Sequence, residues 1–318
     1  GLIGSAQGDT LTGGLAGHSL VGGGGVDTLS YANVSSGVFI DVSTGSVSGS
    51  AGTDRFDGFE VYVGGAGNDT LKGGSGDDSL VAGAGNDILQ GGAGSDYLDG
   101  GAGSDTLSYI NSASGVTASL NDANSSGTGW SDTLVSIENL QGSNFDDMLS
   151  GKHGFAGDDG VNNVINGGSG NDTVTYADAT SAVTIDLSTG AVTGAGGNDT
   201  LQNVEAIIGT DYADSVTGSA ASDTIDAGAG NDAINAGAGN DFVIANEGND
   251  SVAGGAGTDT LSYSAVTGAV AVDLSTGLTS GAAGSDTISG FEAVLGSAYD
   301  DTLTGDAGAN LLSGGAGA

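Results

Sequence analysis

Residues 64–108 read GGAGNDTLK, GGSGDDSLV, AGAGNDILQ, GGAGSDYLD and GGAGSDTLS, five nonapeptides that follow one another without a gap. The sixth residue of every copy is Asp and the eighth is Leu. A second run in the same frame covers 209–262, with Val, Ile or Leu at the eighth position. A short motif that repeats without slippage predicts a solenoid, in which each repeat stacks on its neighbours.

Each nonapeptide divides into a Gly-rich turn and a short strand. Gly permits the tight turn over the first six residues, and the last three form a strand whose central apolar side chain points inward. Two nonapeptides then close one turn of a flattened right-handed spiral, and successive turns stack at about 4.8 Å. The predicted fold class is therefore all-β, a right-handed parallel β-roll or β-helix solenoid. Its two inner walls would hold, respectively, Leu71, Leu89 and Leu107, and Leu80 and Leu98.

A longer unit, here called the long unit, alternates with the nonapeptide runs. Its Asp residues are spaced by 27 and then 15 residues, with a Tyr four after the first Asp and a Glu six after the second. Strand-like segments at 38–42, 183–187 and 270–274 are each followed by a Ser-Thr-Gly turn. We interpret the long units as wider rungs of the same spiral, with the Tyr at the rim, so that 1–318 is one continuous solenoid from a longer chain. The four long units span 27–69, 105–147, 172–214 and 259–301.

The second long unit departs from the other three. It has Ser119 where they have Asp and Ala123 where they have the turn Gly, and a polar stretch covers 121–130. These changes predict an irregular edge for this rung.

The charge of the chain excludes several classes of function. It has 40 acidic and 3 basic residues, a formal net charge of −37. Binding to nucleic-acid phosphates or to an anionic membrane surface requires Lys and Arg. No apolar run is long enough for a membrane-spanning helix, and the lack of Cys excludes disulfides and thiolate metal sites. We therefore expect no nucleic-acid partner and no membrane insertion.

The repeated aspartates predict a metal. Stacking places one turn Asp above the next, and two charges about 4.8 Å apart repel by about 3–4 kcal/mol at an effective dielectric constant of 20. A divalent ion between the turns makes this interaction attractive. Ca²⁺ accepts irregular shells of six to eight oxygens, whereas Mg²⁺ requires strict octahedral geometry and Zn²⁺ prefers His or Cys. We expect about 12–18 Ca²⁺ ions, held by carboxylates and Gly-turn carbonyls. The predicted ligands are Asp9, Asp27, Asp54, Asp69, Asp78, Asp87, Asp96, Asp105, Asp132, Asp147, Asp172, Asp199, Asp214, Asp223, Asp232, Asp241, Asp250, Asp259, Asp286 and Asp301.

With these motifs the chain resembles the repeats-in-toxin (RTX) family of calcium-binding proteins, whose signature is the nonapeptide GGxGxDxUx, with U apolar. The resemblance implies a β-roll that folds on calcium after export by a bacterial type I secretion system, and an extracellular or cell-surface location. It also implies that the sixth-position Asp residues and the turn Gly carbonyls bind calcium. His18, Asn163 and Asn310 depart from the motif, so we predict no site at those positions.

Other interpretations of single residues are weaker. His18 and His153 lie in no catalytic motif, and adjacent acids such as Asp77-Asp78, Asp146-Asp147 and Asp300-Asp301 lie within repeat turns. We therefore predict no enzymatic activity. The four Tyr form either a stripe that binds sugar or ice or packing at the rim, which we favour. The four Glu either cap the wider rung by hydrogen bonding, which we favour, or add a calcium ligand. These residues are Tyr31, Tyr109, Tyr176 and Tyr263, and Glu60, Glu138, Glu205 and Glu292.

The sequence favours a calcium-dependent structural region of a secreted or cell-surface protein, of the adhesin, surface-layer or extracellular-matrix type. One alternative is the C-terminal folding and secretion module of a type I secreted enzyme or toxin. A second is a solenoid that binds polysaccharide or ice. Calcium is the expected partner, with copies of the chain itself or extracellular polysaccharide as further candidates.

Overall fold

A computed structural model describes residues 1–14, 17–49, 52–121, 124–126, 131–152, 162–194 and 197–317. The chain divides into two compact units, residues 1–152 with 168–170 (unit 1) and residues 153–167 with 171–318 (unit 2). The described residues form strands and one 3₁₀ turn, η1 (Val42–Thr44), which confirms the all-β prediction. No helix within these ranges has the length and apolar character of a membrane span.

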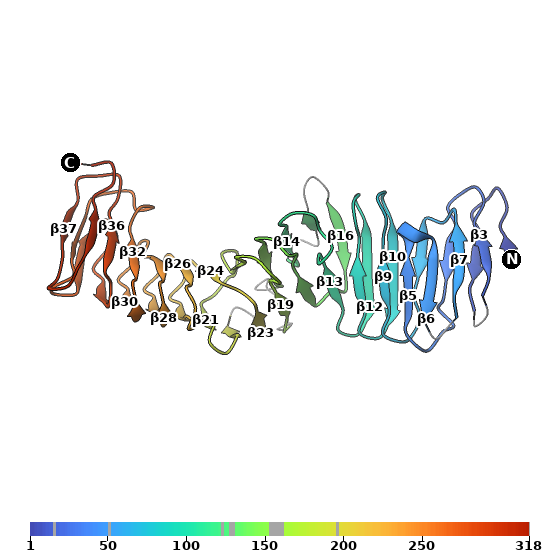
Figure 1. Ribbon diagram of the computed structural model, residues 1–318, viewed down its shortest axis with the longest axis horizontal. Coiled ribbons are helices and arrows are strands. Elements are labelled where there is room, and N and C mark those ends of the chain that lie inside the picture. Colours follow the sequence, from blue (N-terminus) through green and yellow to red (C-terminus); the bar gives the residue numbers. More distant parts are fainter. Residues whose placement is uncertain are drawn as a thin grey trace. The chain divides into compact units, whose positions relative to one another are not determined.

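Unit 1 consists of stacked coils whose strands alternate between two sheets (Figure 1). In spatial order, sheet A contains β1 (Leu2–Ile3), β3 (Ser19–Val21), β7 (Asp54–Asp57), β6 (Ser46–Gly49), β5 (Val38–Asp41), β9 (Thr70–Lys72), β11 (Ile88–Gln90), β13 (Thr106–Ser108) and β17 (Asn139–Gln141). Sheet B contains β2 (Thr10–Thr12), β4 (Thr28–Ser30), β8 (Val61–Val63), β10 (Ser79–Ala84), β12 (Tyr97–Ala102), β16 (Asp132–Val135), β15 (Asn124–Ser126), β14 (Thr117–Ser119) and β18 (Met148–Ser150).

Unit 2 repeats this arrangement. In spatial order, one of its two sheets contains β19 (Val164–Asn166), β23 (Gly197–Gln202), β22 (Ala191–Gly194), β21 (Val183–Asp186), β25 (Ser215–Thr217), β27 (Ala233–Asn235), β30 (Ser251–Ala253), β35 (Thr287–Ser289), β34 (Leu278–Gly281), β33 (Val270–Asp273) and β37 (Thr302–Thr304). The other contains β20 (Thr173–Thr175), β24 (Ala206–Thr210), β26 (Thr224–Gly228), β29 (Phe242–Ile244), β32 (Thr260–Ser262), β36 (Ala293–Leu295) and β38 (Leu311–Ser313). The short strands β28 (Ala238–Gly239) and β31 (Ala256–Gly257) form a further pair.

The register of the parallel strands confirms the predicted coil. Leu71, Leu89 and Leu107 lie side by side in one sheet, and Leu80 pairs with Leu98 in the other. Partners are 18 residues apart, which is two nonapeptides. All five Leu side chains are fully buried, and they form the thin aliphatic core between the sheets.

The turns stack as closely as the strands. Gly83 and Gly85 have φ angles of 113° and 133°, which side-chain-bearing residues rarely adopt. A Cβ atom at either position would overlap the carbonyl group of the glycine one coil earlier, Gly65 or Gly67. Gly is therefore required at these positions both for the backbone conformation and for the close approach of successive turns.

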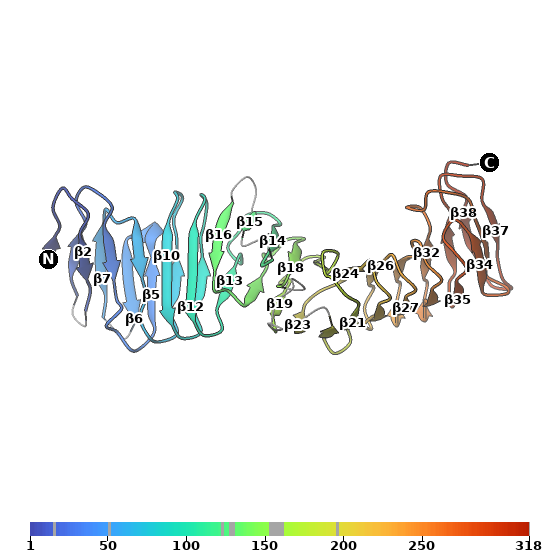
Figure 2. The same ribbon diagram turned by 180° about the vertical axis from the view of Figure 1, so that it is seen from behind.

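The long units are not simply wider rungs, as the sequence suggested. Each contains three adjacent strands, here called a meander, in which the middle strand runs antiparallel to both neighbours. In the first meander, β5 pairs in parallel with β9 of the following coil, and β6 runs antiparallel to β5. The third strand, β7, pairs in parallel with β3 of the preceding coil. Seen from behind, β16, β15 and β14 form the same arrangement in the second long unit (Figure 2). The rest of that unit's polar stretch, 122–123 and 127–130, lies outside the described residues.

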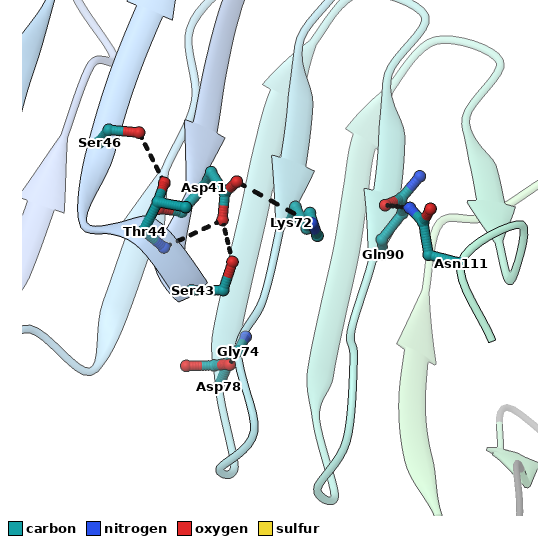
Figure 3. A network of polar contacts seen from close by, with 9 residues as sticks. All are labelled: Asp41, Ser43, Thr44, Ser46, Lys72, Gly74, Asp78, Gln90 and Asn111. Atoms are coloured by element: carbon teal, nitrogen blue, oxygen red, sulfur yellow. Dashed lines mark hydrogen bonds and ion pairs between the residues drawn. The ribbon is translucent and has the colours of Figure 1, made fainter. Parts of the chain in front are cut away.

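A local motif reverses the chain in the first meander. The carboxylate of Asp41 accepts hydrogen bonds from the Ser43 hydroxyl at 2.5 Å and the Thr44 backbone N–H at 3.2 Å (Figure 3). Gly45 then adopts a left-handed conformation, with φ 59°. The same Asp-x-Ser-Thr-Gly sequence, with equivalent hydrogen bonds from Ser188 and Ser275, follows β21 and β33. This hydrogen bonding makes the Ser-Thr-Gly turn a strand reversal.

Candidate metal sites

The sixth-position aspartates form a column inside each edge of the coil, here called the inner ladder. In most of them, one carboxylate oxygen accepts the backbone N–H of the residue stacked beneath it. The Asp69 N–H donates to Asp87 at 2.7 Å, and the Asp87 N–H donates to Asp105 at 2.8 Å. In unit 2 the Asp223 N–H donates to Asp241 at 2.9 Å. All twenty predicted ligands are buried except Asp9, Asp78 and Asp301.

The second carboxylate oxygen distinguishes the members of the ladder. In one group this atom is buried and has no hydrogen-bond partner, although the Asp itself is at most 2% exposed. A buried carboxylate oxygen without a donor is costly unless a cation completes its surroundings. This group fits a calcium ion best, and it contains Asp27, Asp87, Asp96, Asp105, Asp241 and Asp259.

The first glycine of the turn makes room for this oxygen. A Cβ atom on Gly100 would lie 2.6 Å from Oδ2 of Asp105. Gly254 has the same relation to Asp259, at 3.0 Å. The space beside the unpartnered oxygen therefore depends on the glycines that the nonapeptide repeats.

In a second group the oxygen is already bonded within its own turn. It accepts the backbone N–H of the residue four positions earlier, for example from Gly65 to Asp69 at 2.5 Å and from Gly74 to Asp78 at 2.7 Å. This group contains Asp9, Asp69, Asp78, Asp147, Asp214, Asp223 and Asp301.

Burial disfavours the charged form of the inner-ladder carboxylates. Loss of hydration, together with repulsion from ladder neighbours, raises the pKa of Asp87 and of Asp96 to about 6. In unit 2 the same causes raise the pKa of Asp232 to about 7 and that of Asp250 to about 6. Backbone N–H donors oppose these shifts but do not cancel them. Without a cation, these carboxylates therefore take up a proton at a higher pH than an exposed Asp does.

The four tyrosines belong to the ladder and not to the rim, which corrects the sequence prediction. Tyr31, Tyr176 and Tyr263 are buried, and Tyr109 is half-buried. Each hydroxyl donates to the second Asp of its long unit. The distances are 2.6 Å to Asp54, 3.3 Å to Asp132, 3.0 Å to Asp199 and 2.7 Å to Asp286. The three buried rings therefore cannot belong to an outer stripe for sugar or ice.

Burial also keeps the proton on these tyrosines. Desolvation and the neighbouring Asp54 raise the pKa of Tyr31 well above its usual range, and burial with Asp286 does the same for Tyr263. Each hydroxyl is therefore a hydrogen-bond donor.

The four glutamates continue the ladder through the long units. Glu60 immediately precedes β8, so it stacks on Asp27, which precedes β4. Its carboxylate accepts the Asp27 N–H at 2.8 Å, and Glu292 accepts the Asp259 N–H at 2.9 Å. Glu138 and Glu205 repeat this bond. The favoured hydrogen-bonding role is confirmed.

A second column, the outer ladder, was not predicted. Side chains at the fifth position accept the backbone N–H one coil later, from Asn86 to Asn68 at 3.0 Å and from Ser95 to Asp77 at 2.8 Å. The inner ladder accepts from the coil before, so the two ladders link the coils in opposite directions. The recurrence of Asn, Asp and Ser at this position was the available signal.

The positions that depart from the motif keep only part of its geometry. His18 and Asn163 donate their backbone N–H groups to Asp54 and Asp199, as ladder aspartates do, but supply no carboxylate. Asn310 accepts the Asp306 N–H at 2.8 Å within its own turn. His153 lies outside the described residues.

The ladder is a column and not a cluster. In the described ranges no three His, Asp or Glu side chains gather around one point. A calcium shell here therefore requires backbone carbonyl oxygens as well as carboxylates, as the sequence suggested.

The described groove of unit 1 does not present a pair of catalytic acids. It has a volume of about 440 Å³, and Lys72, Gln90 and Asn111 lie in its lining, with Gln90 and Asn111 joined by a 2.8 Å hydrogen bond (Figure 3). Asp132, bonded to Tyr109, is the acidic residue in this lining. Glycoside hydrolysis generally uses two opposed carboxyl groups. In the adjacent pair Asp77-Asp78, each residue belongs to a different ladder.

Comparison with protein families gives a match to the RTX calcium-binding nonapeptide repeat at residues 48–89, 73–107, 160–178, 208–243, 228–261 and 280–318. These segments cover more than half of the chain. The comparison detects no catalytic domain, and a search of curated proteins found no match. The repeat, the stacked coils and the buried Asp ladders agree, and the chain belongs to the RTX calcium-binding repeat family.

Proposed function

We propose that the chain is a calcium-switched structural region of a secreted or cell-surface protein, of the adhesin, surface-layer or matrix type. One observation carries the proposal. Buried carboxylate oxygens such as those of Asp87 and Asp105 lie in stacked columns without a donor. The net charge of −37 opposes stacking, and the few basic residues cannot neutralise it.

Calcium would act on the folded state alone. The ladder exists only when the coils are stacked, so binding free energy becomes folding free energy. We propose that the chain stays unfolded at the low calcium concentration of a bacterial cytoplasm and stacks after type I export. Each further coil adds about 4.8 Å to the length of the stack. A calcium-loaded stack would thereby serve as a stiff spacer.

Calcium titration of the full chain tests the folding step. We expect far-UV circular dichroism to change from coil to β on addition of millimolar calcium and to revert with a chelator. Asp87→Asn should bind less calcium and fold at a higher calcium concentration, because it removes a charge from the inner ladder. Asp77→Asn is the matched control, since it removes the same charge from the exposed outer ladder. Identical spectra with and without chelator would contradict the proposal.

The spacer role has its own test. Single-molecule stretching of the full chain should show a high unfolding force in calcium and free extension in chelator. A calcium-loaded chain that extends without resistance would exclude a mechanical role while leaving calcium binding intact.

A further inference from the structure

The second Asp of each long unit differs from the rest of the inner ladder because its second carboxylate oxygen accepts a hydrogen bond from a tyrosine hydroxyl. In the first long unit, Oδ1 of Asp54 accepts the His18 backbone N–H at 2.7 Å and Oδ2 accepts the Tyr31 hydroxyl at 2.6 Å. In the fourth long unit, Oδ1 of Asp286 accepts the Asp250 backbone N–H at 3.0 Å and Oδ2 accepts the Tyr263 hydroxyl at 2.7 Å. Asp87, buried to the same extent as Asp54, has a partner for Oδ1 only.

The surroundings of Asp54 and Asp199 also differ from those of a ladder position between two stacked Gly-Asp turns. The next strand beyond Asp54 is the antiparallel β6, where Val47 lies opposite Asp54. Val192 lies opposite Asp199 in the same way. A Gly-Asp turn therefore stacks on one side of each residue at most. On the inner side a buried aromatic ring occupies the space, and a Cβ atom on Gly13 would overlap the Tyr31 ring.

We propose that these four corners are metal-free, and that the tyrosine hydroxyl takes the place that calcium has elsewhere in the inner ladder. The four Tyr–Asp pairs are Tyr31–Asp54, Tyr109–Asp132, Tyr176–Asp199 and Tyr263–Asp286. A neutral O–H donor stabilises a buried carboxylate without supplying charge, and such charge-assisted bonds are strong. Each pair joins residues 23 positions apart, and so connects the start of the long unit to the last strand of its meander. The four corners thus differ both from ladder positions with an unpartnered oxygen and from those whose second oxygen is bonded within its own turn.

The inference rests on the proposed calcium function, and the calcium content of the folded full chain tests it. Bound calcium is measured by elemental analysis after equilibrium dialysis in excess calcium. Asp54→Asn and Asp286→Asn should retain the calcium content of the unaltered chain, because neither residue holds an ion. Asp87→Asn and Asp241→Asn, at unpartnered ladder positions, should lose bound calcium. Loss of calcium in Asp54→Asn or Asp286→Asn equal to that in Asp87→Asn overturns the inference.

Tyr31→Phe provides a second measurement that does not alter a carboxylate. It removes one oxygen and keeps the buried ring, so the chain should fold in calcium with unchanged calcium content. Its melting temperature should fall by a few degrees, because Oδ2 of Asp54 loses its donor. Lower calcium content, or an unchanged melting temperature, would overturn the inference. If the unaltered chain bound no calcium, or if Asp87→Asn and Asp241→Asn lost none, the proposed function would fail, which is a distinguishable result.

Discussion

The two units place their meanders differently. In unit 1 the first meander, β5 to β7, lies in sheet A, whereas the second, β14 to β16, lies in sheet B. In unit 2 both meanders, β21 to β23 and β33 to β35, lie in the same sheet. The long units themselves have identical Asp spacing in all four copies. The cause must therefore lie between them.

The number of nonapeptides between long units accounts for the difference. Each nonapeptide carries the chain from one sheet to the other. Four steps separate Asp69 from Asp105 in unit 1, and five separate Asp214 from Asp259 in unit 2. The parity of this number decides which sheet receives the next meander. Repeat number is thus a structural variable in this protein as well as a measure of length.

Deletion of one nonapeptide from unit 2 is expected to have the largest effect. Removing 236–244 leaves four steps, so the second meander should move to the opposite sheet while the chain still folds in calcium. Spin labels at Thr193→Cys and Ser280→Cys, both exposed positions in unit 2 meanders, report the change. The second label should move across the stack by on the order of 10 Å, the distance between packed sheets. Deletion of two nonapeptides, 236–253, is the control and should keep the labels on one sheet, so the label separation after the single deletion should be larger than in this control. Equal separations in the two deletions would refute the parity rule.

Protonation of the ladder carboxylates at acid pH should partly replace calcium in stabilising the stacked coils. As the pH falls, this stabilisation should appear in unit 2 first. The pKa of Asp232 is raised to about 7, and those of Asp87 and Asp250 to about 6, by burial within the folded ladder. Because the folded form binds these protons more tightly than the unfolded chain, this stabilisation is complete below pH of about 4 and is lost as the pH rises through 6 to 7. Hydrogen exchange in chelator should show protection appearing as the pH falls, near Asp232 before Asp87. Protection that grows as the pH rises would contradict the assigned sign.

The cost of a core substitution should follow the number of buried carbon atoms that it removes. Unit 1 has Leu at every inward position of its run, and unit 2 has Val and Ile at most of them. Leu89→Ala removes a fully buried side chain and should cost about 2–5 kcal/mol, whereas Ile234→Val should cost about 0.5–1.5 kcal/mol. Denaturant unfolding in saturating calcium measures both values. Equal losses would mean that the thin core contributes little compared with the ladders.

Substitutions in the outer ladder should have the smallest effect on stability, and the effect should be the same in both units. Asn86 and Asn240 each donate to one coil and accept from another. Because water can replace bonds at exposed positions, Asn86→Ala and Asn240→Ala should each cost about 1 kcal/mol or less. Thermal unfolding in calcium checks this. A larger loss in one unit would show that the outer ladder is not equivalent along the chain.

Several features of the sites could not be predicted because they depend on contacts across the coil. The pairing of Tyr31 with Asp54 spans 23 residues and arises only when the meander returns β7 to the side of β3. The antiparallel direction of β6 has no signature in its residues, Ser-Val-Ser-Gly, since alternation is the same in either direction. Whether the second carboxylate oxygen of a ladder Asp has a hydrogen-bond donor likewise depends on its folded surroundings, because the sequence motif is the same at these positions.

Periodicity alone determined the coil, its two walls and the column of acids, because a repeat of nine residues with one inward side chain can stack in few other ways. It also determined the need for a counterion, since like charges at fixed spacing must be neutralised for the coils to stack. Only the tertiary structure decided which carboxylates have hydrogen-bond partners and which do not. The physical reason is that a donor such as the Tyr31 hydroxyl reaches its acceptor through space, after the chain has reversed twice, and no local pattern records that distance.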